Sequence, residues 1–242
     1  GVFSGGSGSD INIAANSGSE LTFDSLTLTD LTSTTVASNN SFTIYGNHAN
    51  LTTVTVGPSG LTLNNSRILM QWSTASTAGN ELILGGDMVA NGTSTIQNTG
   101  TWAGILRLNT TTDAVTRTFD VAAASLLRIE ANMTNGKPSG GAPVGDAGIV
   151  KTGLGTLALT GANAYTGGTT VAEGVLSLRT RSALPASGQV DVAANAVLAL
   201  GVKADDSAYF GAADVTALFQ NDLPNISMAD DALVGIDTAA GN

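Results

Sequence analysis

Residues 153–178 read GLGTLALTGANAYTGGTTVAEGVLSL, and this stretch decides the fold. It contains two segments of mostly alternating apolar side chains, one around Leu157 and Leu159 and one from Val171 to Leu178. Alternation of this kind places side chains on one face of a strand. Between the segments, glycines permit a positive φ, and Asn163 tolerates the same backbone region. The stretch therefore predicts two short strands joined by a sharp corner.

The same stretch resembles the autotransporter-associated β-strand repeat, also called the passenger-associated transport repeat. The residues that carry the resemblance are Gly153, Gly155, Leu157, Leu159, Thr160, Gly161, Ala162, Asn163, Tyr165, Thr166, Gly167, Gly168, Thr169, Thr170, Val171, Gly174, Leu176 and Leu178. Ala164 departs from the family pattern, which usually has Thr at this position. The resemblance implies an all-β fold, a right-handed parallel β-helix, in a large secreted bacterial surface protein. From the residues alone, the alternative is an antiparallel hairpin in a β-sandwich.

The composition also supports a stack of short strands. The 242 residues include 30 glycines, 5 prolines and no cysteine, and 12% of them are charged. An average soluble domain carries about twice that share of charge, whereas Thr, Ser and Asn suit the outer faces of a solenoid. A hydrophobic fraction of 42% is high enough to exclude a disordered low-complexity segment.

Charge and cysteine content restrict the partners and the location. A net charge of −10 argues against nucleic acid or an anionic membrane surface as a partner. The lack of cysteine excludes disulfides and thiolate metal sites. No run approaches the roughly 20 apolar residues of a membrane-spanning helix, and residues 1–5 do not resemble a signal peptide. We expect an extracellular or outer-surface module without membrane insertion by this segment, excised between the rungs of a longer array.

Turn residues separate candidate strands along the rest of the chain. These strands are expected at 11–14, 21–28, 41–45, 53–56, 60–63, 67–72, 81–84, 105–108, 116–121, 126–130, 149–152, 189–192 and 196–200. With rungs of about 20–25 residues, the chain would make on the order of ten rungs. The expected organisation is a solenoid over 1–202 with the family repeat at 149–179, an acidic and partly helical insert at 203–231, and a last strand and turn at 232–242.

Two regions break the strand pattern. Residues 135–143 have the composition of an irregular loop. In the second region, Asp206 and Ser207 precede an apolar stripe with helical spacing, formed by Ala212, Val215, Leu218 and Phe219. This spacing predicts a short helix near the C-terminus that ends near Pro224 and packs against the rod.

Few residues are candidates for catalysis or metal binding. Arg107 and Arg128, 21 positions apart, would meet on successive rungs with Asp113 or Asp120 nearby, and a surface ion-pair ladder is the alternative interpretation. His48, the only histidine, fits an exposed turn, so no Ser-His-Asp set can be assembled. Residues 5–10, GGSGSD, match the start of a calcium-binding nonapeptide, but the motif occurs once. We therefore assign no catalytic, cofactor or metal residue.

Three functional classes remain open. The first, which we favour, is a non-catalytic structural module that stacks head to tail on copies of itself to build a fibre or sheath. The second is a passenger or stalk segment of an autotransporter-like adhesin, which displays loops to a host surface or glycan. The third is a polysaccharide-degrading β-helix enzyme, whose chemistry would need clustered Asp, Arg or Lys on one face.

Overall fold

The computed structural model describes residues 1–4, 10–15, 20–32, 41–46, 52–72, 80–99, 104–136, 145–185, 187–204 and 206–238. The candidate calcium motif at 5–10 therefore lies almost entirely outside the described residues, as do His48 and most of the predicted loop at 135–143. Within the described chain, no helix is long and apolar enough to cross a bilayer.

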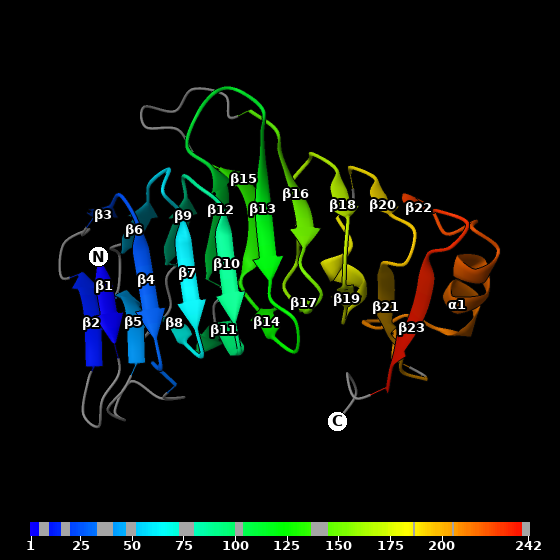
Figure 1. Ribbon diagram of the computed structural model, residues 1–242, viewed down its shortest axis with the longest axis horizontal. Coiled ribbons are helices and arrows are strands. Elements are labelled where there is room, and N and C mark those ends of the chain that lie inside the picture. The colour runs from blue at the N-terminus through cyan, green and yellow to red at the C-terminus, as the bar shows by residue number, and fades with distance from the viewer. Residues whose placement is uncertain are drawn as a thin grey trace.

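The strands form three parallel sheets that run along the molecule (Figure 1). Sheet A consists of β1 (Val2–Ser4), β4 (Leu26–Thr29), β7 (Leu61–Asn64), β10 (Met88–Asn91), β13 (Val115–Val121), β16 (Ala147–Thr152), β18 (Thr169–Val171), β20 (Val190–Val192) and β22 (Ile226–Met228). Sheet B consists of β2 (Asp10–Ala15), β5 (Ser41–Gly46), β8 (Arg67–Trp72), β11 (Thr93–Thr99), β14 (Leu126–Ile129), β17 (Thr156–Leu159), β19 (Val175–Leu178), β21 (Val197–Gly201) and β23 (Leu233–Asp237). Sheet C consists of β3 (Glu20–Phe23), β6 (Thr53–Val56), β9 (Glu81–Leu84), β12 (Ile105–Asn109) and β15 (Asn132–Gly136).

The chain visits the sheets in a fixed order and so builds a coil. Each of the first five circuits contributes one strand to sheet A, then one to sheet B and one to sheet C, and each strand pairs in parallel with its counterpart one circuit later. This confirms the predicted parallel β-solenoid. The antiparallel hairpin alternative is wrong, because β17 pairs in parallel with β19.

The length of a rung varies more than predicted. Lys151 pairs with Val171, 20 positions further along the chain, whereas Leu26 and Leu61 are 35 positions apart and Val192 and Met228 are 36 apart. The expected rung length therefore holds for the repeat and for the first rung, where Val2 pairs with Thr27, but not for rungs two to five. A third strand and longer connections between strands lengthen rungs two to five, and an insert lengthens the eighth rung.

The core lies inside the coil and continues along its length. Inward positions alternate along each strand, as in β4, where Leu26 and Leu28 are fully buried while Thr27 and Thr29 are not. Leu26, Leu61, Met88 and Phe119 form one inward column, because their strands pair in register. Each fully buried aliphatic side chain contributes about 1.5–3 kcal/mol, so this stack of columns stabilises the rod as a unit.

The corner between sheets A and B repeats a left-handed backbone residue. Asp30, Asn65, Ala124 and Asn195 adopt φ values of 55°, 44°, 56° and 63°, and glycines occupy the equivalent corner in other rungs. Asn and Asp tolerate this region because their short side chains bond locally, but alanine is strained there. The path of the coil therefore imposes the left-handed conformation at this corner, since three residue types besides glycine adopt it.

Sheet C ends at β15, and the cross-section changes at that point (Figure 1). From β16 onward each rung has one strand in sheet A and one in sheet B. The connection that replaces the third strand is irregular in the sixth rung, the 3-10 helix η1 (Arg181–Ala183) in the seventh, and a longer segment with helix α1 (Ala212–Phe219) in the eighth. The family-like stretch thus begins where the rod loses its third sheet.

Helix α1 confirms the predicted short helix, but the predicted apolar stripe is wrong in part. Leu218 is buried against the core, whereas Phe219 is 68% exposed. Consecutive residues of a helix point about 100° apart, so a two-turn helix cannot turn both side chains toward the rod. The helix ends at Phe219, before Pro224. Strand β22, inside the range expected as an insert, continues sheet A.

Candidate functional site

The family-like residues occupy two successive rungs, β16 to β19. Leu157 pairs with Leu176 and Leu159 pairs with Leu178 in the parallel register of sheet B, and all four side chains are buried. Val171 is buried in sheet A, whereas Thr170 on the same strand is exposed. The leucines of the motif are therefore core residues stacked rung on rung, and their periodicity predicted this placement.

The glycines of the motif allow neighbouring rungs to approach closely. Gly153 and Gly174 have φ values of +72° and +66° at the corner between sheets A and B. A Cβ at Gly155 would lie 2.2 Å from the carbonyl oxygen of Ala122, and one at Gly161 would lie 2.2 Å from that of Ala131. Both distances are far below contact, so a side chain at either position would push the rungs apart.

Asn163 closes the end of sheet C. Its side-chain Oδ1 accepts a hydrogen bond from the N–H of Met133 in β15, at 3.2 Å. Its Nδ2 donates to the carbonyl oxygen of Ala183 in η1, at 2.8 Å. The residue is 7% exposed. The side-chain amide thus stands in for the missing strand and pairs backbone groups of the rungs on both sides of it.

Tyr165 fills the interior next to this cap. It is the largest fully buried side chain among the described residues, and its hydroxyl lies 2.7 Å from Oγ1 of Thr169. Burial raises the pKa of Tyr165 to about 12, although the hydrogen bond to Thr169 opposes the shift. The tyrosine therefore stays neutral and serves the core, with its polar end satisfied.

Thr166 and the glycines that follow it complete the turn back into sheet A. The N–H of Thr166 donates to Oδ1 of Asn135, at 2.8 Å, and the N–H of Gly167 donates to the carbonyl oxygen of Ala147, at 2.8 Å. A Cβ at Gly167 would lie 2.6 Å from backbone atoms of Ala147. The Thr160–Gly168 segment is thus a compact connection that replaces a strand with side-chain and turn hydrogen bonds.

Lys151 is an inward-facing cation in the first rung of the repeat. Its strand partners Phe119 and Val171 are core residues, and Lys151 itself is 0% exposed. Nζ donates to the carbonyl oxygens of Thr152 and Gly153, at 2.7 Å each, and to that of Glu173, at 3.2 Å. Burial lowers the pKa of Lys151 to about 8, and nearby carboxylates oppose this shift. All three donors of the ammonium group are used, so Lys151 secures the corner.

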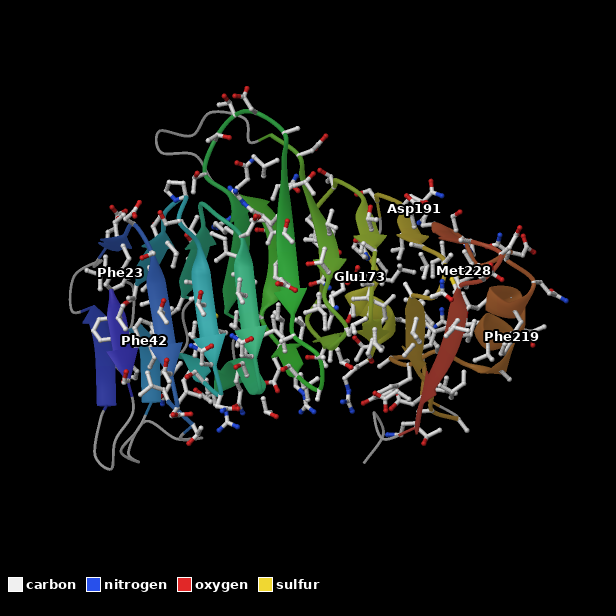
Figure 2. All side chains as sticks on the ribbon, in the orientation of Figure 1. Phe23, Phe42, Glu173, Asp191, Phe219 and Met228 are labelled. Atoms are coloured by element: carbon white, nitrogen blue, oxygen red, sulfur yellow. The ribbon has the colours of Figure 1, made fainter. Side chains whose placement is uncertain are left out.

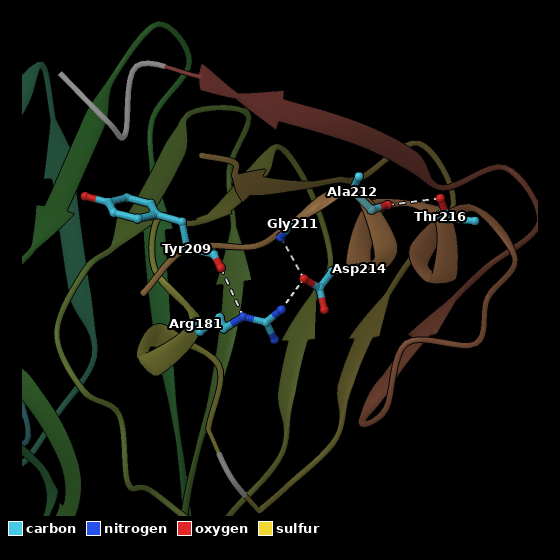
Figure 3. A network of polar contacts seen from close by, with 6 residues as sticks. All are labelled: Arg181, Tyr209, Gly211, Ala212, Asp214 and Thr216. Atoms are coloured by element: carbon cyan, nitrogen blue, oxygen red, sulfur yellow. Dashed lines mark hydrogen bonds and ion pairs between the residues drawn. The ribbon is translucent and has the colours of Figure 1, made fainter. Parts of the chain in front are cut away.

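An ion-pair network fastens the helical segment to the second rung of the repeat (Figure 3). The Arg181 guanidinium pairs with the Asp214 carboxylate, and its Nε donates to the carbonyl oxygen of Tyr209 at 3.0 Å. Asp214 also accepts the N–H of Gly211 at 2.7 Å, which caps helix α1. Burial by itself would raise the pKa of Asp214, but the bonds from Gly211 and Arg181 outweigh it and hold the pKa below its usual value.

The predicted meeting of Arg107 and Arg128 is wrong. Arg107 lies in sheet C and pairs in register with Ile83 and Thr134, whereas Arg128 lies in sheet B. The error comes from assuming a rung as short as the separation of the two arginines, because every rung in this part of the chain is longer. Arg107 instead forms an ion pair with Glu81, one rung earlier, and both side chains are largely buried. No group of three or more potential metal-ligating side chains occurs among the described residues.

Sequence reasoning missed the roles of Lys151 and Arg181. An apolar strand with one lysine at an inward position, Ile149-Val150-Lys151, is a signal that could have identified the first. A recurring Val-Ala pair is another signal that was overlooked. It marks the end of a sheet A strand at Val121-Ala122, 171–172 and 192–193. In each case the alanine N–H continues the ladder to the previous rung. The Arg181–Asp214 pair spans 33 positions, and no local pattern marks it.

These features define a parallel β-solenoid that carries a compact two-rung unit at the point where its third sheet ends. Residues 149–178 match the family model described as Passenger-associated-transport-repeat. The match runs from β16 to the last residue of β19, and so confirms the resemblance read from the residues. This repeat belongs to autotransporter-associated surface proteins. Neither the curated proteins nor the solved structures contain a match to the chain.

Proposed function

We propose that this chain is a non-catalytic, extracellular structural module of a large bacterial surface protein. The observation that carries the proposal is the unbroken rung-to-rung pairing in sheets A and B, from β1 to β22 and from β2 to β23. A rod of this kind separates two points in space, and its stability comes from nearest-neighbour contacts between rungs. The family repeat supports the surface location.

Within this proposal, copies of the module stack end to end into a fibre or sheath. The strands at both ends of the stack carry apolar side chains, such as Phe23 of β3 and Met228 of β22 (Figure 2). At one end, Val2 is 74% exposed, and Phe3 packs edge-on against Phe23 at 6.0 Å between ring centroids. At the other end, Leu233 and Ile236 of β23 are 53% and 46% exposed. Pairing of strand edges with a second copy would cover these groups.

A second candidate is a passenger or stalk segment that displays its surface to a host surface or glycan. The repeat match favours it, because the family takes its name from passenger domains. In this case the same end strands pair with further rungs of the longer polypeptide, and the module is monomeric when isolated. A translocator barrel encoded after this segment in the same gene would favour the passenger segment over the fibre subunit.

Electron microscopy and sedimentation velocity of the purified chain over a wide concentration range test the stacking. Filaments with a regular axial repeat are expected. Ile236→Lys places a charge on the end strand and should abolish them, while Leu154→Lys is the control, because Leu154 is 69% exposed at a corner within the rod. A chain that remains monomeric at high concentration would contradict stacking and favour the passenger segment.

The absence of catalysis is tested separately. The purified chain should release no products from uronate and neutral polysaccharides, with or without calcium. Product release that disappears on substitution of a charged outer-face residue would overturn the non-catalytic assignment.

A further inference from the structure

Two arginines stand in one row on the outer face of sheet B. Arg67 in β8 pairs in register with Thr95 in β11, and Thr95 pairs with Arg128 in β14. The residues on either side of this row, such as Ile68 and Ile129, belong to the core, so the row faces outward. Adjacent strands are about 4.8 Å apart, which places the two arginine backbones about 10 Å apart along the rod.

The guanidinium groups of this row have few partners. Among the described residues, Arg67 donates one hydrogen bond, from Nη1 to the carbonyl oxygen of Thr32 at 3.0 Å. In the part of the chain that the structure describes, neither arginine forms an ion pair within the usual contact distance. Nε of each arginine is buried without a hydrogen-bond partner among the described residues. A guanidinium has five donors, so most of the row's donor capacity is unused by the described part of the fold.

A cavity opens beside Arg67, at the corner between sheets A and B. Its volume is about 440 Å³, within the range of small-molecule sites. Its polar lining comes from three rungs and includes Asp30, Thr32, Asn65, Thr93 and Thr95 together with Arg67. Carboxylate, amide and hydroxyl groups of this kind recognise sugar hydroxyls, and the guanidinium matches a carboxylate with two parallel hydrogen bonds.

We propose that this row and cavity, the Arg67–Arg128 groove, bind an acidic glycan, with sugar carboxylates on Arg67 and Arg128 and sugar hydroxyls on the polar residues between and beside them. The net charge of −10 disfavours general attraction of polyanions. Recognition therefore depends on local geometry. An acidic glycan places a carboxylate for each arginine and hydroxyls for the Asp, Asn and Thr side chains of the cavity, whereas an acidic peptide or nucleic acid offers charged groups without this array of hydroxyls. The groove requires the rod fold but not end-to-end stacking.

Glu130 is the internal competitor for this ligand. It follows β14, two positions after Arg128, and is half-buried. Burial raises the pKa of Glu130, and the charges of Arg128 and Arg67 partly offset the shift. Glu130 therefore sits within electrostatic range of both guanidinium groups without pairing closely with either. Removal of its charge should leave the arginines more available to an external carboxylate.

Calorimetric titration of the intact chain with three hexasaccharide probes tests the proposal. The probes are hexamers of galacturonate, mannuronate and hyaluronate, and the comparison ligands are the methyl-esterified galacturonate hexamer and a polyglutamate of equal charge. We expect at least one acid hexamer to bind, with affinity at least tenfold above that of the two comparison ligands. Binding should also weaken as ionic strength rises.

Single substitutions test the named residues. Arg128→Gln should weaken binding about tenfold, as expected for the loss of one charge-assisted pair. Arg67→Gln should have a similar effect, and Arg67→Lys a smaller one. Glu130→Gln should strengthen binding, while Lys203→Gln, the charge-matched control, should leave it unchanged, because Lys203 pairs with Asp206 in the C-terminal insert.

Three results would each overturn the proposal. The first is the absence of binding by all three acid hexamers. The second is equal binding of polyglutamate, which would indicate general attraction of polyanions. The third is unchanged affinity in both Arg67→Gln and Arg128→Gln, with thermal unfolding showing that the variants are folded. End-to-end stacking is measured separately, so a failure of either idea is recognised independently of the other.

Discussion

Asn163→Ala should cost the protein more stability than the loss of an exposed asparagine side chain in a neighbouring rung. The change leaves the N–H of Met133 and the carbonyl oxygen of Ala183 without their partners, which lie at 3.2 Å and 2.8 Å in the native protein. Asn163 is 7% exposed, so water cannot easily replace the amide. A buried backbone group left unpaired costs about 1–3 kcal/mol, so two of them cost about 2–6 kcal/mol.

Equilibrium urea unfolding and amide hydrogen exchange measure this effect. The Met133 N–H should exchange faster in Asn163→Ala, because its acceptor is gone. Asn132→Ala is the matched control: Oδ1 of Asn132 accepts the N–H of Ala162 at 2.8 Å in an exposed position, where water can substitute, and the cost should stay below about 1 kcal/mol.

Asn163→Asp adds a test of the donor role. An ionised carboxylate can accept from Met133 but cannot donate to Ala183, whereas the protonated acid can do both. The pKa of the introduced carboxyl should therefore be raised in the fold. The folded state then binds more protons than the unfolded chain between the two pKa values, so this variant should lose stability as pH rises. The role of Asn163 as the cap of sheet C would be refuted by either of two results. One is a loss of unfolding free energy below about 0.5 kcal/mol in Asn163→Ala, and the other is an unfolding free energy that does not depend on pH in Asn163→Asp.

Three further substitutions test other parts of the coil. The pKa of Lys151 is about 8 in the fold against an ordinary 10.5. The free energy of unfolding of the wild-type chain should therefore rise with pH between these two values. Urea unfolding at pH 7.5 and pH 10 should show a smaller rise in Lys151→Met. Glu81→Ala strands the buried Arg107 guanidinium and should cost about 3 kcal/mol, whereas Glu81→Leu with Arg107→Leu should restore most of it. Ala124→Gly relieves a φ of 56° and should raise the unfolding free energy by about 0.5–1 kcal/mol.

The parts of the fold that were predictable depend on local patterns. Alternating leucines placed β17 and β19, but the left-handed residues were misplaced: positive φ was expected at the glycines between the two strands and at Asn163, whereas it occurs at Gly153 and Gly174. The alternation is visible in the sequence because the repeat has short rungs, in which strand and corner follow each other within a few residues. The identity of the inward residues in this stretch was therefore settled before any packing was considered.

The parts that were not predictable depend on contacts between rungs. The predicted strand at 21–28 is in fact two strands, β3 and β4, divided at Asp24. The break occurs because the chain turns there from sheet C into sheet A, where the N–H of Gly57 in the next rung donates to the carbonyl oxygen of Phe23. The row of Arg67 and Arg128 was hidden for the same reason, since variable rung lengths obscure which residues share a register.

The change from three strands per rung to two at β15 sets how far a given length of polypeptide can reach. Every rung advances the coil by one strand spacing, about 4.8 Å, whatever its circumference. Lys151 and Val171, which stand one such advance apart, are separated by 20 positions in the chain, while Leu26 and Leu61 are separated by 35. A cell that assembled its surface rods from rungs of the shorter kind would project them nearly twice as far from its envelope for the same amount of protein synthesis, but each rod would be thinner.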